Sequence, residues 1–356
     1  LCNQHKIYSY VVLLLSMTHK GQIITVAFII TLIAAVGTGT AAAQSAPDCS
    51  TVSYSGDGTE SNPYEVSEVN QLQCIEGQDL DASYEIVSDI DATETSSWNN
   101  GEGFEPVGSG SIGGSFGGTI DGNGSTITGL TINRPDTDTV GLFASIINGK
   151  VSDVVIENAD VEGNNTVGIL AGSVGLGADV NRSSTSGTVT GSGMTGGLAG
   201  SVTGFVGSSS STADVTGGTD LGGLVGISSS GVIVNSYARG NVNGDDTVGG
   251  LVGFSGSAGA VEKSYATGTV SANLNTGGII GGNIASFFPD AEPIKDNYWD
   301  TESTGQSEAS ASDNIDADGA TGLTTSDITD SAAATNMQEF DFTNTWKTVS
   351  GDYPIL

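Results

Sequence analysis

The sequence is 356 residues long and carries 41 acidic residues against 9 basic ones, which gives a formal net charge of −32. A surface this negative repels phosphate backbones, which excludes nucleic acid as a partner. The only two histidines, His5 and His19, lie in a leader that we expect to be removed, so the mature chain cannot form Ser-His-Asp, Cys-His or histidine-ligated metal sites.

The dispersed acidic residues and the scarcity of lysine point to the environment of the protein. High charge with few aromatics can indicate disorder, but the periodic Val, Leu and Ile in the middle of the chain argue against it there. Salt screens the self-repulsion of such a surface, so we expect a halophilic archaeon as the source. An acidic cell-surface protein of a mesophile is the alternative.

Residues 1–43 have the features of a leader with a secretory signal peptide. A short basic start at Met17, which we expect to be the true start, precedes an apolar run at 23–36, and small residues follow at 41–43. This pattern predicts cleavage after Ala43. A transmembrane anchor is the alternative, but the apolar run is shorter than the roughly 20 residues that a spanning helix needs. We therefore expect a secreted or cell-surface protein with no membrane span in the mature chain.

Residues 44–139 are predicted to form an N-terminal cap and the first coil or coils of the repeat region. Cys49 and Cys74 are the cysteines that survive processing, and in an exported protein such a pair is most simply one disulfide. Two free thiols are the alternative. A short helix is predicted with Ser67 as its N-cap, an apolar face at 69, 72 and 75, and an end at Gly77. From Phe116 onward, short strands alternate with Gly/Asn turns.

A short Gly-rich phrase then recurs along the chain. Its copies are VGLFAS from Val140, VGILAG from Val167, TGGLAG from Thr195, LGGLVG from Leu221, VGGLVG from Val248 and TGGIIG from Thr276. The copies follow one another at a nearly constant interval of about 27 residues, and a period this regular identifies a repeat architecture.

Each repeat contains three apolar positions. The first column is Phe143, Leu170, Leu198, Leu224, Leu251 and Ile279; the second is Val151, Val180, Val206, Ile233, Val261 and Ile294; the third is Val161, Val189, Val215, Val242 and Val270. Three short strands per repeat, without a helix between them, predict an all-β, right-handed parallel β-helix over residues 140–285. A propeller blade needs about 40–45 residues and is disfavoured.

Residues 286–356 are predicted to form a C-terminal cap. A flexible acidic loop at 304–326 precedes a short helix at 327–337. The apolar side chains after it are expected to fold back on the solenoid; they are Phe340, Phe342, Trp346, Tyr353, Ile355 and Leu356.

The fullest repeats, GGLVGISSSGVIVNSYARGNV from Gly222 and GGLVGFSGSAGAVEKSYATGTV from Gly249, resemble the GLUG motif family of secreted and surface proteins. Similar flanking segments are GDGTESNPYEV from Gly56, SDIDA from Ser88, FGGTIDGNGSTITGLTINRP from Phe116, NYWDTESTGQ from Asn297 and GDYPIL from Gly351. The three copies before residue 221 depart from the pattern and lack its Asn-Ser-Tyr-Ala segment. The resemblance implies an extracellular, often adhesin-like β-solenoid and transfers no catalytic residue.

Few residues suggest chemistry. The aromatic residues Tyr237, Tyr265 and Tyr298, with Trp299 beside the last, could form a platform for sugar rings or a purely structural ladder. The clustered carboxylates Asp153, Glu157, Asp160 and Glu162 could form a catalytic pair, but a solvated acidic face is the simpler interpretation. Asn123, Asn164 and Asn181 lie in glycosylation acceptor sequences.

Two loops match ligand-binding motifs only in part. The segment from Asn314 to Gly319 alternates like a calcium loop, but Thr325 stands where a bidentate Glu is wanted, so a flexible acidic loop is the alternative. GGSFGG from Gly113 lacks the lysine and the helix of a phosphate-binding loop. We therefore expect no resident metal, no cofactor and no catalytic residue.

These observations favour a non-enzymatic surface-interaction or adhesion protein, with envelope glycans or surface proteins as partners. The alternatives are a structural envelope component without a ligand and a carboxylate-dependent polysaccharide hydrolase or lyase.

Overall fold

The computed structural model describes residues 12–19, 22–29, 45–109, 114–256, 258–283, 294–311 and 319–356. The chain divides into two units, Leu1–Ala42 and Ala43–Leu356. In the first unit, strands β1 (Val12–His19) and β2 (Gln22–Ile29) pair antiparallel. The predicted cleavage site after Ala43 and the core of the predicted calcium loop, residues 314–318, lie outside the described residues. Within the ranges given, no helix is long and apolar enough to cross a membrane.

The second unit is an all-β parallel solenoid of about six turns with a repeat of about 28 residues, as predicted. Apart from a C-terminal hairpin described below, its strands form four parallel sheets, numbered here in the order in which each coil passes through them. Sheet 1 contains β9 (Thr139–Val140), β13 (Thr166–Gly168), β17 (Thr195–Gly196), β22 (Thr219–Gly222), β27 (Asp246–Gly249) and β32 (Thr276–Gly277). Sheet 2 contains β10 (Phe143–Ile146), β14 (Ala171–Val174), β18 (Ala199–Val202), β23 (Val225–Ser228), β28 (Val252–Ser255) and β33 (Ile280–Asn283).

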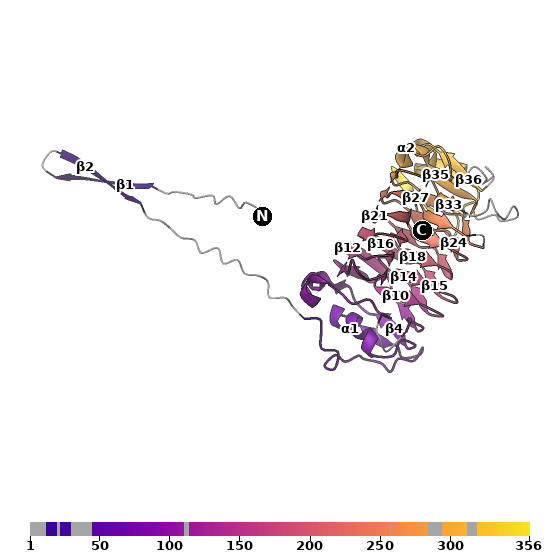
Figure 1. Cartoon of the computed structure of the whole chain (residues 1–356), viewed down its shortest axis with the longest axis horizontal. Coiled ribbons are helices and arrows are strands. Elements are labelled where there is room, and N and C mark those ends of the chain that lie inside the picture. Colours follow the sequence, from indigo (N-terminus) through magenta and orange to yellow (C-terminus); the bar gives the residue numbers. More distant parts are fainter. Residues whose placement is uncertain are drawn as a thin grey trace. The chain divides into compact units, whose positions relative to one another are not determined.

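The other two sheets are longer because they continue into the flanking regions. Sheet 3 contains β3 (Tyr64–Val66), β4 (Ser83–Ile86), β6 (Thr119–Asp121), β11 (Lys150–Ser152), β15 (Asp179–Asn181), β19 (Phe205–Gly207), β24 (Val232–Val234), β29 (Ala260–Glu262) and β34 (Ile294–Lys295). Sheet 4 contains β5 (Ile90–Asp91), β7 (Thr126–Thr128), β8 (Thr131–Asn133), β12 (Val155–Glu162), β16 (Ser184–Gly191), β20 (Ser210–Ser211), β21 (Asp214–Gly217), β25 (Tyr237–Ala238), β26 (Val242–Asn243), β30 (Tyr265–Ala266), β31 (Val270–Ser271), β35 (Asn297–Asp300) and β36 (Ala320–Leu323). Figure 1 shows the coils stacked in chain order from β4 to β36.

Equivalent side chains of successive coils stack in columns inside the solenoid. The second and third predicted columns are confirmed. In the second, each residue from Val151 to Ile294 pairs in register with the next one of the column, and in the third the same holds from Val161 to Val270. All members are at most 4% exposed. Burial of each contributes roughly 1.5–3 kcal/mol, so these columns are the main stabilising element of the stack.

The first predicted column is wrong in its first coil. Val140 pairs with Val167, as the aligned phrases predict, whereas Phe143 pairs with Ala171 and not with Leu170. Between these two positions the Gly-rich phrase of the first coil is therefore one residue shorter than that of the second coil. Phe143 consequently belongs to the column of Ala171.

The phrase also turns the chain between sheets 1 and 2. Leu224 and Leu251 are fully buried at this corner. A Cβ on Gly223 would lie 2.4 Å from the carbonyl oxygen of Gly250, and one on Gly250 would lie 2.3 Å from that of Gly278. Only glycine allows successive backbones to approach this closely. The recurring glycines thus serve coil stacking.

The corner between sheets 3 and 4 has a different construction. Each coil places one residue in the left-handed region there, with φ between 46° and 56°; the six are Asp153, Arg182, Ser208, Asn235, Lys263 and Asp296. From the second of these coils onward, the next residue is a buried serine, or Asn297 in the last coil. The hydroxyl of Ser236 accepts a hydrogen bond from the backbone N–H of Ser209 (3.2 Å) and donates one to the carbonyl of Val234 (2.9 Å). Ser183, Ser209 and Ser264 repeat both bonds, which makes a serine ladder along the corner.

The N-terminal cap closes one end of the core. Helix α1 (Val69–Gln73) and the 3-10 turn at Cys74–Gly77 bury Val69, Leu72 and Ile75, as predicted. The predicted N-cap is wrong, because Glu68 occupies that position and Ser67 instead donates its backbone N–H to Oε1 of Gln71 at 2.7 Å.

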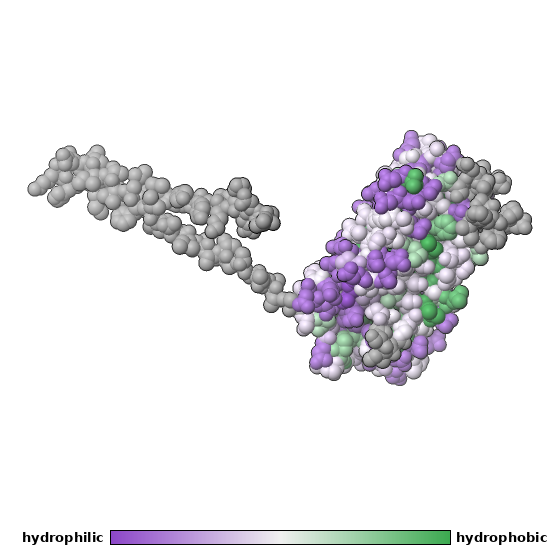
Figure 2. Space-filling view, viewed as in Figure 1, coloured by the Kyte–Doolittle hydropathy of each residue, from purple (hydrophilic) through white to green (hydrophobic). Residues whose placement is uncertain are grey.

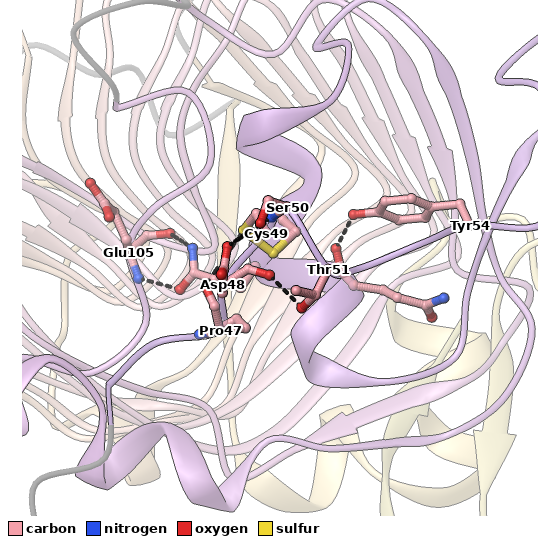
Figure 3. Close-up of a disulfide and its surroundings, with 10 residues drawn as sticks. Pro47, Asp48, Cys49, Ser50, Thr51, Tyr54 and Glu105 are labelled. Atoms are coloured by element: carbon pink, nitrogen blue, oxygen red, sulfur yellow. Dashed lines mark hydrogen bonds between the residues drawn. A yellow bond between two sulfur atoms is a disulfide. The ribbon is translucent and has the colours of Figure 1, made fainter.

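A disulfide anchors this cap. Cys49 is bonded to Cys74, with a Cα–Cα distance of 5.3 Å (Figure 3). Nearby, the hydroxyl of Tyr54 donates a 2.5 Å hydrogen bond to the carbonyl of Gln71. Together these contacts attach the segment that contains Cys49 and Tyr54 to the helical turn at 69–77. Two further 3-10 turns, Thr93–Ser97 and Asn99–Gly101, follow in the cap.

The C-terminal region contains α2 (Thr301–Thr304), α3 (Thr325–Ile328), α4 (Asp330–Asn336) and an antiparallel hairpin of β37 (Lys347–Val349) and β38 (Asp352–Ile355). Residues 308–310 cover the last coil of sheets 1 and 2 through backbone hydrogen bonds to residues 278–280. The predicted helix at 327–337 is present as two short helices. The segment 324–356, here called the C-terminal segment, packs against the flank of sheet 4.

Candidate functional site

A column of tyrosines runs along sheet 4. Tyr237 lies in register with Tyr265, which lies in register with Tyr298. The rings of Tyr237 and Tyr265 stack at 5.1 Å with an interplanar angle of 10°. The left-handed residue two positions earlier, Asn235 in the case of Tyr237, breaks the strand alternation. The tyrosines therefore point out of the coil, while Ala238 points into the main core.

Of the two alternatives for these aromatic residues, the buried structural ladder describes Tyr265 and Tyr298 and the sugar platform does not, because the C-terminal segment covers the column. Tyr265 is 0% and Tyr298 6% exposed, and both belong to a second hydrophobic core with Phe340 and Trp346. Trp299 is 5% exposed and points the other way, into the main core. Tyr237 is half-buried, whereas the other three aromatic residues are buried. The prediction that the apolar C-terminal residues fold back is confirmed for all but Ile355, which is 36% exposed.

Arg239 fastens the C-terminal segment to the column. Its guanidinium donates to the hydroxyl of Tyr265 at 3.0 Å and to the carbonyls of Tyr353 and Pro354 at 2.8 and 3.1 Å, and it forms an ion pair with Asp352 at 3.3 Å. The hydroxyl of Tyr265 in turn donates to the carbonyl of Pro354 at 2.5 Å. Burial raises the pKa of Tyr265, so this hydroxyl stays protonated and remains a donor.

A second fastening lies at the end of β35. The buried carboxylate of Asp300 caps α2 by accepting from the backbone N–H of Glu302. It also accepts from the hydroxyls of Thr325 at 2.7 Å and Tyr353 at 2.6 Å. Burial alone would raise the pKa of Asp300, but the hydrogen bonds from Tyr353, Thr325 and two backbone N–H groups outweigh it and lower the pKa.

These fastenings leave a groove beside the covered column. Where the column changes from Tyr237 to Ser210 and Ser184 in the preceding coils, the side chains become small. The recess between these serines and the hairpin has a volume of about 570 Å³. Arg182 and Lys347 lie at its wall. This is the site that the structure assembles and that the sequence motifs did not indicate.

The predicted glycosylation asparagines differ in their surroundings. Asn123 lies exposed in a turn with φ of 51°. The amide of Asn164 donates to Asp138 at 2.7 Å, and that of Asn181 donates to Asp179 at 2.8 Å. Modification remains a prediction, and it is best accommodated at Asn123.

The clustered carboxylates do not converge. Asp153 pairs with Arg182, and Asp160 accepts from the hydroxyl of Thr188 at 2.9 Å. Glu157, Asp160 and Glu162 lie exposed on β12. Among the residues that the structure describes, no three His, Cys, Asp or Glu side chains come together to hold a metal ion.

The fold and the site together define a repeat scaffold of the parallel β-solenoid class with a C-terminal segment docked on one flank. On the face drawn in Figure 2, residues of near-neutral hydropathy cover most of the surface, with hydrophilic patches among them and few hydrophobic residues. No family model matches the chain.

Two known proteins are similar to parts of the chain. It is 41% identical over 156 residues to Halomucin of Haloquadratum walsbyi, a match that covers 42% of this chain and 2% of Halomucin. It is 38% identical over 99 residues to a protein of Evansella cellulosilytica named "Putative Gly-rich membrane protein", which covers 27% of this chain and 11% of that protein. The chain thus spans only a small part of the length of either relative.

Proposed function

We propose that this chain is an exported, non-enzymatic β-solenoid of a halophilic archaeon that acts in cell-surface interaction or adhesion. The observation that carries the proposal is the similarity of this chain, over 156 residues, to Halomucin, which is a haloarchaeal protein. The Cys49–Cys74 disulfide supports an exported location, because disulfides persist in oxidising compartments. The net charge of −32 supports function in high salt, where screening removes the self-repulsion.

The architecture suits such a role. Coils stacked by parallel ladders give a rigid surface on which outward side chains repeat at the strand spacing of about 4.8 Å. Interior columns and glycine corners fix the scaffold, so any specificity resides in outward residues that differ between coils. Repeated weak contacts along such a surface add up by multivalency.

The proposal is tested by measuring binding of the labelled protein to cells and isolated envelopes in molar salt, with an unrelated protein of similar negative charge as control. We expect saturable binding that the control protein does not show. Absence of binding to both preparations would remove the adhesion role. A structural envelope component would instead remain with the envelope on fractionation without binding added cells. Release of reducing sugar or unsaturated product from a polysaccharide panel would contradict the non-enzymatic assignment.

A further inference from the structure

The groove beside Tyr237 has an unusual charge for this protein. Residues 44–356 contain only seven basic side chains against 41 acidic ones, yet the groove is lined by Arg182 and Lys347 and by no Asp or Glu. Lys347 is exposed and has no ion-pair partner among the described residues. The side chains that line the groove thus carry positive charge in a chain dominated by acidic residues; Arg182 is paired with Asp153, and Lys347 is the cation that no carboxylate of the described residues neutralises.

Arg182 is held in position for a ligand. Its Nε donates to Oδ1 of Asp153 at 2.8 Å and its Nη2 donates to Oδ2 at 2.5 Å. The Asp153 carboxylate is thereby occupied, while Nη1 of Arg182 has no partner in the described part of the chain. The arginine side chain is still 59% exposed. A guanidinium fixed in this way loses little entropy when it binds an anion.

The groove is lined by one serine of the ladder, Ser183, and by three serines outside the ladder whose hydroxyls have a different environment. Ser183 and Ser209, which belong to the ladder, both donate and accept hydrogen bonds within the protein. Ser184, Ser208 and Ser210 line the groove, and their hydroxyls make no hydrogen bond to the described residues. Ser210 is nevertheless 7% exposed. Unpaired hydroxyls in a recess are suited to polar ligand groups.

Tyr237 supplies an aromatic wall. One side of its ring stacks on Tyr265, whereas its neighbour in the preceding coil is the small Ser210. Arg239 lies 5.2 Å from the ring centroid and Trp346 packs 6.1 Å away, so only part of the ring is exposed, and this part contributes to the lining of the groove. An aromatic surface, several hydroxyls and two cations within about 570 Å³ match the apolar face, the hydroxyls and the charge of an acidic sugar.

We propose that this groove binds an anionic sugar unit, carboxylated or sulfated, of a surface glycan. The inference rests on the proposed surface-interaction function and names its ligand class. Long-range repulsion by the acidic surface is screened within about 3 Å at 1 M salt, so in molar salt the direct contacts to Arg182 and Lys347 decide binding.

The test is calorimetric titration of the full protein in molar NaCl with three probes: a galacturonic acid oligomer, a sulfated galactose oligomer and an unmodified galactose oligomer. We expect one or both anionic oligomers to bind at least roughly tenfold more tightly than the neutral one, because charge-assisted hydrogen bonds are lost with the latter. Which anionic oligomer binds distinguishes carboxylate from sulfate. Equal affinity for all three, or no binding of any, would overturn the inference.

Matched variants locate the site. Lys347→Gln removes one exposed charge in the groove, and Lys295→Gln removes one exposed charge on sheet 3, outside it. We expect K347Q to lower the affinity for the anionic oligomer roughly five- to twentyfold and K295Q to leave this affinity unchanged. Arg182→Lys keeps the charge but loses the paired hydrogen bonds to Asp153 that fix the side chain, and it should weaken binding as well. Equal effects of K347Q and K295Q would place the ligand elsewhere, while binding to cells and envelopes, measured separately, would still decide the proposed function.

Discussion

The hydroxyl of Tyr353 donates a 2.6 Å hydrogen bond to Oδ2 of Asp300, which joins the last strand of the chain to the strand that ends the tyrosine column. The same carboxylate caps α2 and accepts from Thr325 at the start of α3. One buried group thus connects the final coil to both ends of the C-terminal segment. The covering of Tyr265 and Tyr298 depends on this connection and on Arg239.

Replacement of Asp300 by Asn should loosen the C-terminal segment without unfolding the solenoid. The amide keeps the shape of the carboxylate but weakens the charge-assisted bonds from Tyr353 and Thr325, at a cost of about 1–3 kcal/mol. Hydrogen exchange of residues 324–356 should accelerate while that of β15 and β19 stays slow. Glu339→Gln, an exposed change in the same segment, is the control and should have no effect. Equal acceleration in the coils would contradict the idea that the segment docks as a separate layer.

Acid should release the same segment. The pKa of Asp300 is lower in the folded protein than in the unfolded chain, where it is about 3.9. The carboxylate therefore contributes stability that is fully present above about pH 4 and is lost as the pH falls through the lower, folded pKa. Proteolysis or hydrogen exchange followed from pH 6 to 2 should show release of 324–356 on the acid side. In D300N this pH dependence should be largely absent, and an unchanged acid profile would assign it to other carboxylates.

The columns of the solenoid could be predicted because they depend on a periodicity that is visible in the sequence. Val180 and Val206 occupy inward positions whose apolar character repeats, so alignment of the repeats is sufficient to place them in register. Alignment of the repeats misplaces Phe143, because one residue is missing inside the phrase of the first coil. The phrase can then be aligned with the next copy in two ways, and both match apolar residues with apolar residues. Only the backbone pairing with Ala171 distinguishes them.

The candidate site depends on features that periodicity does not encode. The direction of Tyr237 follows from the left-handed φ of Asn235, and the residues at that corner share no side-chain type. Sequence alone left open whether these aromatic residues form a sugar platform or a structural ladder, because the docking of Phe340 and Trp346, which buries Tyr265 and Tyr298, is a long-range contact. The groove forms where a tyrosine column changes to serine beside a hairpin that is distant in the sequence, as Arg182 and Lys347 illustrate.

Gly250→Ala should destabilise the stack strongly. A methyl group there would lie 2.3 Å from the carbonyl oxygen of Gly278 and 2.9 Å from Cβ of Ala266, so the backbones of two coils would have to separate. We expect a loss of about 1–3 kcal/mol or more, since overpacking against backbone cannot be relieved by a rotamer change. Denaturant unfolding in molar salt measures it. At Gly77 the nearest contact of a new methyl is 3.6 Å, so Gly77→Ala serves as the control and should stay within about 0.5 kcal/mol.

Ser236→Ala should interrupt the serine ladder. The hydroxyl of Ser236 is fully buried and is the acceptor for the backbone N–H of Ser209, so its removal leaves that donor unpaired in the interior. An unsatisfied buried donor costs about 1–3 kcal/mol, although alanine itself fits the space. Denaturant unfolding should show this loss, and exchange of the Ser209 amide should accelerate more than that of Ser183. Ser230→Ala, at an exposed loop position, is the control. If both variants unfolded alike, the ladder would be a by-product of serine-rich composition and not a stabilising element of the corner.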